Sequence, residues 1–296
     1  MVVITGATGQ TGSKIASKLL DKGVKIRVVG RSAEKLEVFQ KRGAEISIGD
    51  QGDASFFTNA LRNADAVYLL IPPKPDASDV LSYYNLLGES AIAAIRNSGI
   101  KKVVFLSSLG AELASGTGPV LGLHFVEEKL KKLAGIDLAL LRPGFFMENI
   151  IWSVGLIKHQ HIFGNSASPD TPFSLIATQD IAEKASNLLE KLSFSGFSIV
   201  DLFGDLLSYN QVTQHLGKVI GNPSLPYVQF QEADALKSMM GMGLSESVAK
   251  SYIDLSLALG KGIIHATQTD PHKPNTATSF AKFAKEVFLP VFQNAA

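Results

Sequence analysis

Short apolar segments alternate with helical segments along the first half of the chain. Runs rich in β-branched residues predict strands, and the stretches between them either show helical spacing, as from Val80 to Ile95, or end at a glycine, as at Gly23 and Gly43. The predicted strands cover residues 2–5, 24–30, 44–49, 66–71, 102–107 and 137–142. This alternation predicts an α/β fold with a Rossmann-like, doubly wound parallel sheet, which binds ligands beyond the carboxyl ends of its strands.

The alternation stops after residue 150. One more helix, over 178–192 with Asp180 as its expected cap, and one more strand, over 197–203, are predicted next, and beyond Ser208 the chain is predicted to be mostly helical. We therefore expect a parallel-sheet domain over 1–150, to which 177–204 return. A smaller, mostly helical substrate lobe is expected from 151–176 and 205–296.

Composition narrows the function classes. The chain has 296 residues, a net charge of +1 and no cysteine. Near-neutral charge without a basic block argues against nucleic acid or an anionic membrane as the main partner, and the lack of cysteine excludes disulfides and thiolate metal sites. The start "MVVITGATG" lacks a signal-peptide pattern and no apolar run is long enough to span a membrane, which favours a cytoplasmic protein. His159 and His161 lack a third ligand nearby in the sequence, so no metal site is expected.

The segment "TGATGQTG" places Gly6, Gly9 and Gly12 between the first predicted strand and the first predicted helix. Gly6 allows a tight turn, Gly9 lets a pyrophosphate approach the backbone, and Gly12 allows the helix to pack closely on the strand. The N-terminus of the helix then presents its unpaired N–H groups to the phosphates. Because the pattern follows the first strand of an alternating sheet, it predicts a dinucleotide site.

The residues after the second and third strands bear on the choice of cofactor. Arg31 stands where an NAD-specific site would carry an acid, and Lys35 follows one helical turn later. A guanidinium suits a ribose 2′-phosphate, so NADPH is the predicted cofactor, although both residues could be ordinary surface charges. Asp50 could accept a bond from the adenine amino group or cap the next helix. Pro72 could lie near the cofactor ribose or form a rigid turn.

A run of motifs resembles the NmrA-like branch of the atypical short-chain dehydrogenases. The matching segments are "GATGQTG" (6–12), "VVGRS" (28–32), "GD" (49–50), "LLIPP" (69–73), "VVFLSSLGA" (103–111), "LRPGFFMEN" (141–149) and "DIAEKA" (180–185). That family contains NADPH-dependent quinone and dye reductases, and also dinucleotide-binding redox sensors and transcriptional regulators without a known reaction. By this resemblance, the residues expected to touch the cofactor are Gly6, Thr8, Gly9, Gln10, Thr11, Gly12, Arg31, Asp50, Pro72 and Ser107, with Pro143 and Phe145 of "PGFF" (143–146) beside the nicotinamide.

The helix predicted around "VLGLHFVEEKL" (120–130) lacks the catalytic tyrosine of the wider superfamily. Reductases there pair a tyrosine with a lysine four residues later, and the lysine lowers the phenol pKa so that the phenol can protonate the reduced oxygen. Val120 and His124 stand near those two positions here. A simple ketone needs that proton because its reduction yields an alkoxide. A quinone yields a delocalised hydroquinone anion, and a cationic dye accepts hydride without a proton.

These residues predict an NADPH-dependent reductase of a small-molecule hydride acceptor such as a quinone or a dye. The alternative is a non-catalytic NADP(H)-binding redox sensor or transcriptional regulator with a protein partner, and the sequence is compatible with an oligomer. The candidate catalytic residues are His124, which Glu128 could join on one helix face, and Ser107; each could equally be structural.

Aromatic and sulfur-bearing side chains follow the "PGFF" segment. Phe146, Met147 and Trp152, next to Phe145, could form a wall for a flat acceptor. Core packing would explain the same residues, so their role as substrate contacts is a hypothesis.

Overall fold

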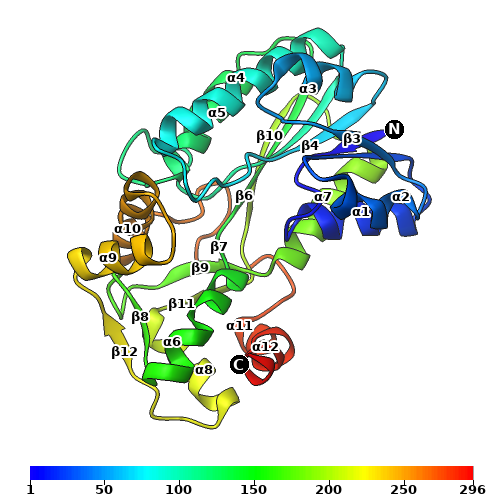
Figure 1. Ribbon diagram of the computed structural model, residues 1–296. Coiled ribbons are helices and arrows are strands. Elements are labelled where there is room, and N and C mark those ends of the chain that lie inside the picture. The colour runs from blue at the N-terminus through cyan, green and yellow to red at the C-terminus, as the bar shows by residue number, and fades with distance from the viewer. Residues whose placement is uncertain (296) are drawn as a thin grey trace.

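A computed structural model describes residues 1–295 (Figure 1). Its main sheet has the strand order β10-β6-β5-β4-β1-β2-β3, and every neighbouring pair is parallel. The strands are β1 (Val2–Ile4), β2 (Ile26–Gly30), β3 (Glu45–Ile48), β4 (Ala66–Leu69), β5 (Lys102–Leu106), β6 (Asp137–Pro143) and β10 (Phe197–Leu202). The Rossmann-like, doubly wound sheet is therefore confirmed, and each strand lies within or next to a predicted one.

Helices cover both faces of this sheet because its strands are apolar on both sides. Successive strand residues point to opposite faces: Val3 packs in one buried cluster with Val126, and Ile4 packs in another with Ile15. One face carries α3 (Ala54–Leu61), α4 (Val80–Ser98) and α5 (Val120–Leu130), and the other carries α1 (Gly12–Asp21), α2 (Ala33–Gln40) and α7 (Thr178–Lys191) (Figure 1).

The remaining elements form a second lobe, which lies below the main sheet in Figure 1. Two small sheets are present there, in the orders β11-β9-β7 and β12-β8. Their strands are β7 (Phe145–Phe146), β8 (Phe163–Asn165), β9 (Phe173–Ile176), β11 (Asp205–Leu207) and β12 (Tyr227–Gln229). The helical segments are the 3₁₀ helix η1 (Met147–Ser153), α6 (Val154–Gln160), α8 (Tyr209–Ile220), α9 (Glu232–Gly241), α10 (Glu246–Gly260), α11 (Phe280–Phe283), the π-helical η2 (Ala284–Phe288) and α12 (Leu289–Asn294). The lobe is thus mostly helical, as expected, with small sheets that the sequence did not indicate.

The expected cap of α7, Asp180, is wrong, and so is the alternative role of Asp50 as the cap of the next helix. Helix α7 has Ala177 at its N-cap, and Asp180 lies inside the helix, where its carboxylate accepts bonds from the Thr278 N–H at 2.9 Å and the Thr278 hydroxyl at 2.8 Å. The cap of α3 is Asp53, whose Oδ1 accepts from the N–H groups of Ser55 and Phe56, whereas Asp50 lies three residues earlier.

Among residues 1–295, no helix combines the length and apolar character needed to cross a bilayer. The same residues contain no group of three or more His, Asp or Glu side chains placed to hold a metal ion.

Candidate functional site

The carboxyl ends of β1, β2, β4 and β5 meet at one edge of the sheet because these strands are adjacent and parallel. The strand order reverses at β1, since β2 and β3 extend the sheet on one side and β4, β5 and β6 on the other. An open α/β sheet binds its ligand in the crevice at such a reversal. The glycine turn from β1 to α1 lies there.

The glycine turn has the geometry of a pyrophosphate cradle. Gly6 has φ +62°, which favours glycine, and its carbonyl accepts the Gly9 N–H at 2.9 Å. A Cβ on Gly12 would overlap the backbone of Gly6, so only glycine allows α1 to start so close to β1. Thr8, Gly9 and Gln10 are exposed.

The start of α1 has no cap from its own N-cap residue. The Thr11 side chain does not cap the helix, and its hydroxyl oxygen accepts instead from the buried Tyr68 hydroxyl at 3.0 Å. The Ser13 N–H donates to the Gly9 carbonyl at 3.2 Å, and the other N–H groups of the first turn lie at the carboxyl edge of the sheet, where an anionic phosphate is favoured. On these observations the turn fits a dinucleotide.

Arg31 and Asp50, the residues predicted to bind the adenosine end of the cofactor, both lie near Tyr83. Arg31 follows β2 and Asp50 follows β3, and both are exposed. Burial raises the pKa of Tyr83 on α4, and the charges of Arg31 and Asp50 both act on the same phenol. The Lys74 ammonium lies 5.9 Å from the centroid of the Tyr83 ring. The sequence analysis missed Tyr83 because it reads as one more residue of an amphipathic helix.

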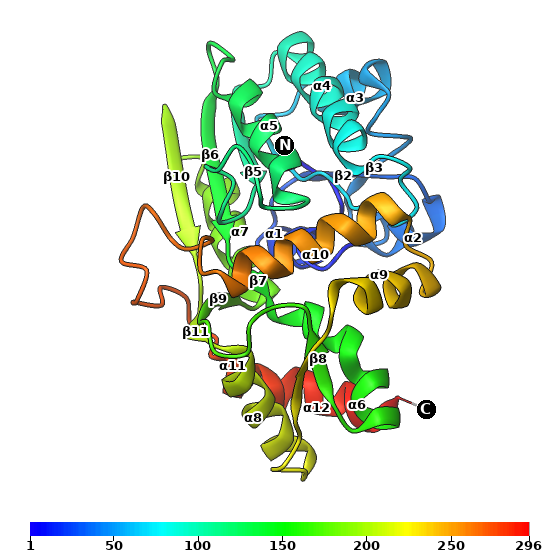
Figure 2. The same ribbon diagram turned by 90° about the vertical axis from the view of Figure 1, so that its left-hand side faces the viewer.

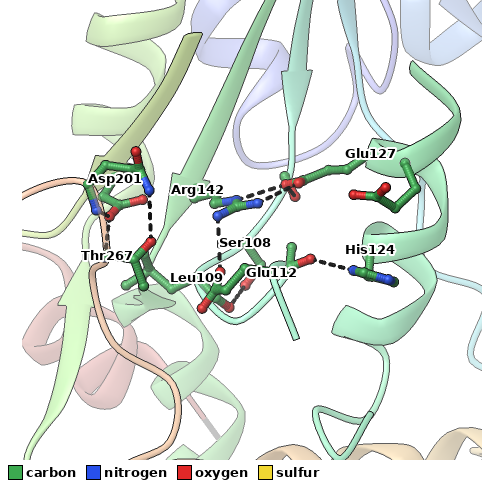
Figure 3. Close-up of polar contacts among 12 residues, drawn as sticks. Ser108, Leu109, Glu112, His124, Glu127, Arg142, Asp201 and Thr267 are labelled. Atoms are coloured by element: carbon green, nitrogen blue, oxygen red, sulfur yellow. Dashed lines mark hydrogen bonds and ion pairs between the residues drawn. The ribbon is translucent and has the colours of Figure 1, made fainter. Parts of the chain in front are cut away.

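A buried ionic network lies behind the end of β5 (Figure 3). Arg142 of β6 donates to Glu127 of α5 through Nε at 2.9 Å and Nη2 at 2.6 Å, and through Nη1 to Glu112 at 3.1 Å. Burial alone would lower the pKa of Arg142, but the bonds and charge of Glu127 raise it above its usual value. The Ser107 hydroxyl donates to Glu127 at 2.5 Å.

Ser107, which was predicted to contact the cofactor, is part of this network. Its side chain is buried, and its proton is directed at Glu127 rather than into the crevice. The hydroxyl oxygen can still accept a bond, so Ser107 as a cofactor contact remains a prediction. Sequence reasoning did not name Glu112, Glu127 or Arg142.

His124 lies on α5 and is half-buried. Its Nδ1 lies 2.8 Å from the Ala111 carbonyl oxygen (Figure 3). Because a carbonyl can only accept, Nδ1 carries the proton in this bond, and Nε2 is the acceptor of the neutral ring. The structure thus leaves one ring nitrogen of His124 available for a ligand.

The tyrosines provide no substitute for the missing acid. Burial raises the pKa of every tyrosine in the chain above its ordinary value, so each phenol is a weaker acid than usual: Tyr68, Tyr83, Tyr84, Tyr209, Tyr227 and Tyr252. Tyr84 packs against α5, where a Cβ on Gly122 would overlap its ring. The phenol beside α5 is therefore buried and is not activated.

The structure separates the predicted acceptor-wall residues. Phe145 and Phe146 are half-buried in β7, and the Phe145 ring meets Phe173 edge-on at 5.8 Å. Met147 is fully buried in the core of the second lobe, whereas Trp152 is 82% exposed. Of these four residues, only the two phenylalanines are half-buried, and one glycine separates them from Pro143, the last residue of β6.

A family model described as the NmrA-like family matches residues 1–258. The chain is 26% identical to the NAD(P)H azoreductase of Xenophilus azovorans over 289 residues, which cover 96% of this chain and 97% of that protein. It is 26% identical to quinone oxidoreductase 2 of Escherichia coli (strain K12) over 268 residues, which cover 88% of this chain and 89% of the relative.

Solved structures agree with these relatives. The NADPH-dependent quinone oxidoreductase of Escherichia coli, complexed with NADPH, superposes with a TM-score of 0.81 at 25% identity and covers 97% of this chain and 100% of that chain. The Citrobacter sp. triphenylmethane reductase has a TM-score of 0.80 at 17% identity over 98% of this chain and 99% of that chain, and so shows a shared fold. Since the family model extends from β1 into α10, this protein belongs to the NmrA-like family.

Proposed function

We propose that this chain is an NADPH-dependent reductase that transfers hydride to a quinone, a dye or a similar conjugated small molecule. Its relatives over most of the chain are reductases and oxidoreductases, and the reaction class is accordingly that of an oxidoreductase. The glycine turn supports a nicotinamide dinucleotide, and Arg31 after β2 favours the form with a 2′-phosphate.

The observation that carries the choice of acceptor is the absence of an activated phenol. Val120 and His124 of helix α5 stand near the positions where the superfamily carries tyrosine and lysine, and burial raises the pKa of all six tyrosines. Bound NADPH supplies the hydride. The chain is then left to bind, orient and exclude water, which suffices for an acceptor whose reduced anion is delocalised.

Different residues at the carboxyl edge of the sheet would bind the separate parts of the cofactor and the acceptor. The glycine turn would hold the pyrophosphate, and Arg31 the 2′-phosphate. Pro143 and Phe145, at the junction of β6 and β7, would lie against the nicotinamide, with Phe146 towards the acceptor. Nε2 of His124 would accept a ribose or acceptor hydroxyl. We propose a cofactor domain over 1–150 with 177–204 and a substrate lobe over 151–176 with 205–296. The boundary lies at 145–150, because Phe145, Met147 and Ile150 already pack with the second lobe.

Anaerobic stopped-flow mixing tests this function. The protein with NADPH is mixed with benzoquinones and naphthoquinones, a triphenylmethane dye and, as controls, unactivated ketones. We expect protein-dependent oxidation of NADPH with the conjugated acceptors and little with the ketones. Tight NADPH binding without turnover on any acceptor would instead support the sensor, and ready reduction of the ketones would show that an acid is present.

A further inference from the structure

We propose that Glu112 is a positioning residue for His124: through Arg142 it holds the turn that carries the Ala111 carbonyl, and so it fixes the His124 tautomer. The importance of this tautomer for hydride transfer rests on the proposed function, whereas the tautomer itself does not.

The turn after β5 is anchored differently at its two ends. At its start, the Ser107 N–H donates to the Leu141 carbonyl at 2.8 Å and the Leu109 N–H to the Pro143 carbonyl at 3.0 Å. These bonds tie it to the backbone of β6. At its end, two backbone bonds close the turn on itself, from the Ala111 N–H to the Ser108 carbonyl at 3.2 Å and from the Leu113 N–H to the Gly110 carbonyl at 3.1 Å. The side chain of Glu112 ties this end to β6, through the 3.1 Å contact with Arg142. The residues that follow, 114–116, are exposed.

Arg142 is held rigidly enough to act as an anchor. It is 2% exposed, and Nε and Nη2 grip both oxygens of Glu127, whose side chain is fully buried. A bidentate, buried pair of this kind fixes the plane of the guanidinium. Its remaining nitrogen, Nη1, is thereby aimed at Glu112.

His124 is connected to both residues whose carboxylates bind Arg142, Glu127 and Glu112. It precedes Glu127 by three residues on α5, so the two side chains share a helix face. Its bond partner, Ala111, directly precedes Glu112. Arg142 therefore sets the distance between α5 and the turn, and the 2.8 Å bond from His124 Nδ1 to Ala111 reports that distance (Figure 3).

This arrangement has a chemical consequence. Whichever ring nitrogen of a histidine makes a fixed hydrogen bond decides where the proton lies. With Nδ1–H committed to Ala111, Nε2 offers a lone pair to a ligand hydroxyl. If the turn is no longer held by Glu112, the ring can carry its proton on Nε2 instead. The Nε2–H group would then face the hydrogen of the same ligand hydroxyl and could not accept it.

The first test measures the tautomer directly. Two-bond ¹H–¹⁵N correlation spectra of histidine-labelled protein distinguish the Nδ1–H and Nε2–H forms, and the His124→Ala spectrum assigns the signals. We expect the Nδ1–H form in the wild type and a shift towards Nε2–H in Glu112→Ala. Glu112 is 27% exposed on its side chain, so its removal should leave the fold intact. Far-UV circular dichroism checks this, and Glu112→Met, which keeps the length of the side chain but offers Arg142 no oxygen acceptor, is the second variant if Glu112→Ala unfolds.

Glu89→Ala is the matched control. The Glu89 carboxylate of α4 also bonds a residue of α5, but it accepts from Lys129 at 2.5 Å rather than from Arg142. Its removal should leave the tautomer unchanged. A His124 tautomer that does not respond to Glu112→Ala, or that responds equally to Glu89→Ala, would overturn the proposal.

The second test is a double-mutant cycle on single-turnover hydride transfer to a quinone. Glu112→Ala should slow transfer by about 3- to 10-fold in the wild type and by less than about 2-fold when His124 is already alanine. Equal losses in both backgrounds would mean that Glu112 supports only the fold. If the wild type transfers no hydride at all, the proposed function fails, and the tautomer measurement still decides the role of Glu112.

Discussion

Arg31 is the side chain that we propose decides between the two dinucleotides. It follows β2 at the edge of the sheet where the glycine turn lies, and it is exposed. Arg31→Glu would remove a charge-assisted pair with the 2′-phosphate and add repulsion. Such pairs contribute about 1.5–3 kcal/mol, so we expect the Kd for NADPH to rise by at least about 10-fold, with a much smaller change for NADH.

Fluorescence titration of both cofactors measures this effect. Lys25→Glu is the control, because Lys25 precedes β2 and carries a like charge at the opposite edge of the sheet. It should leave both affinities within about 2-fold. Equal affinities of the wild type for NADPH and NADH would remove the assignment of Arg31.

His124 is expected to assist without acting as the obligatory acid. General acid–base catalysis typically contributes about 10²–10⁴-fold. Because a reduced quinone can take its proton from solvent, His124→Ala should slow single-turnover transfer by less than about 100-fold at unchanged NADPH affinity. A loss beyond about 10⁴-fold would show that His124 supplies the proton and that α5 carries a true acid.

Single residues also show which contacts could not be predicted from the sequence. Glu127 and Glu128 are neighbours in "VEEKL", yet the Glu127 side chain is fully buried and that of Glu128 is 45% exposed. Glu127 lies seven residues after the buried Val120 and therefore on the apolar side of α5. Its position in the sequence thus indicated that its side chain is buried. Its partner could not be inferred, because Arg142 reaches it from β6 through tertiary contact.

At the level of whole elements, the start of α7 depends on a distant carboxylate. Glu148 of η1 accepts from the Thr178 N–H through both oxygens, at 3.0 and 3.1 Å, and from the Thr178 hydroxyl. It is also 3.6 Å from the Lys14 ammonium in the first turn of α1. One side chain therefore links the glycine-turn helix, the segment after β7 and α7.

Replacing this cap should destabilise the protein measurably. Glu148→Ala removes the acceptor for the Thr178 N–H, and a lost cap typically costs about 0.5–2 kcal/mol. We expect Tm to fall by a few degrees, on the order of 2–4 °C. Calorimetry should show a change of less than about 0.5 kcal/mol for Glu183→Ala, which removes an exposed ion pair from α7 itself. Similar losses in both variants would argue against the cap.

The elements that sequence could predict are those whose pattern is local. Main-sheet strands and their helices follow from periodicity and from nearby caps such as Ser32, which accepts the Lys35 N–H. The cap of α7 was missed because Glu148 precedes Thr178 by 30 residues. Strand β7 is only two residues long, too short for any alternation, and forms because β9 pairs with it.

Over the whole molecule, α10 joins the second lobe to the cofactor-binding half (Figure 2). The Ser245 N–H, at its N-cap, donates to the Pro75 carbonyl at 2.9 Å, and Ser247 accepts the Val80 N–H at 3.0 Å. Both partners belong to the segment after β4, which includes Pro72 at the cofactor edge. Closer to its middle, α10 presents the Ser251 carbonyl to Gly118, two residues before α5.

Gly118 should therefore set how closely α10 approaches the site. Gly118→Ala would place a Cβ onto the Ser251 carbonyl, whereas Gly116→Ala meets nothing within 4 Å. Both glycines have positive φ, +58° and +77°, so both variants carry a backbone strain of about 1–2 kcal/mol, and their difference isolates the helix contact. We expect Gly118→Ala to be less stable than Gly116→Ala by about 1–3 kcal/mol, the usual cost of overpacking. It should also raise the KM for the quinone, because α10 must move away from the turn before α5. Calorimetry and steady-state kinetics on the two variants make the comparison; equal stability and equal KM would mean that α10 does not shape the site.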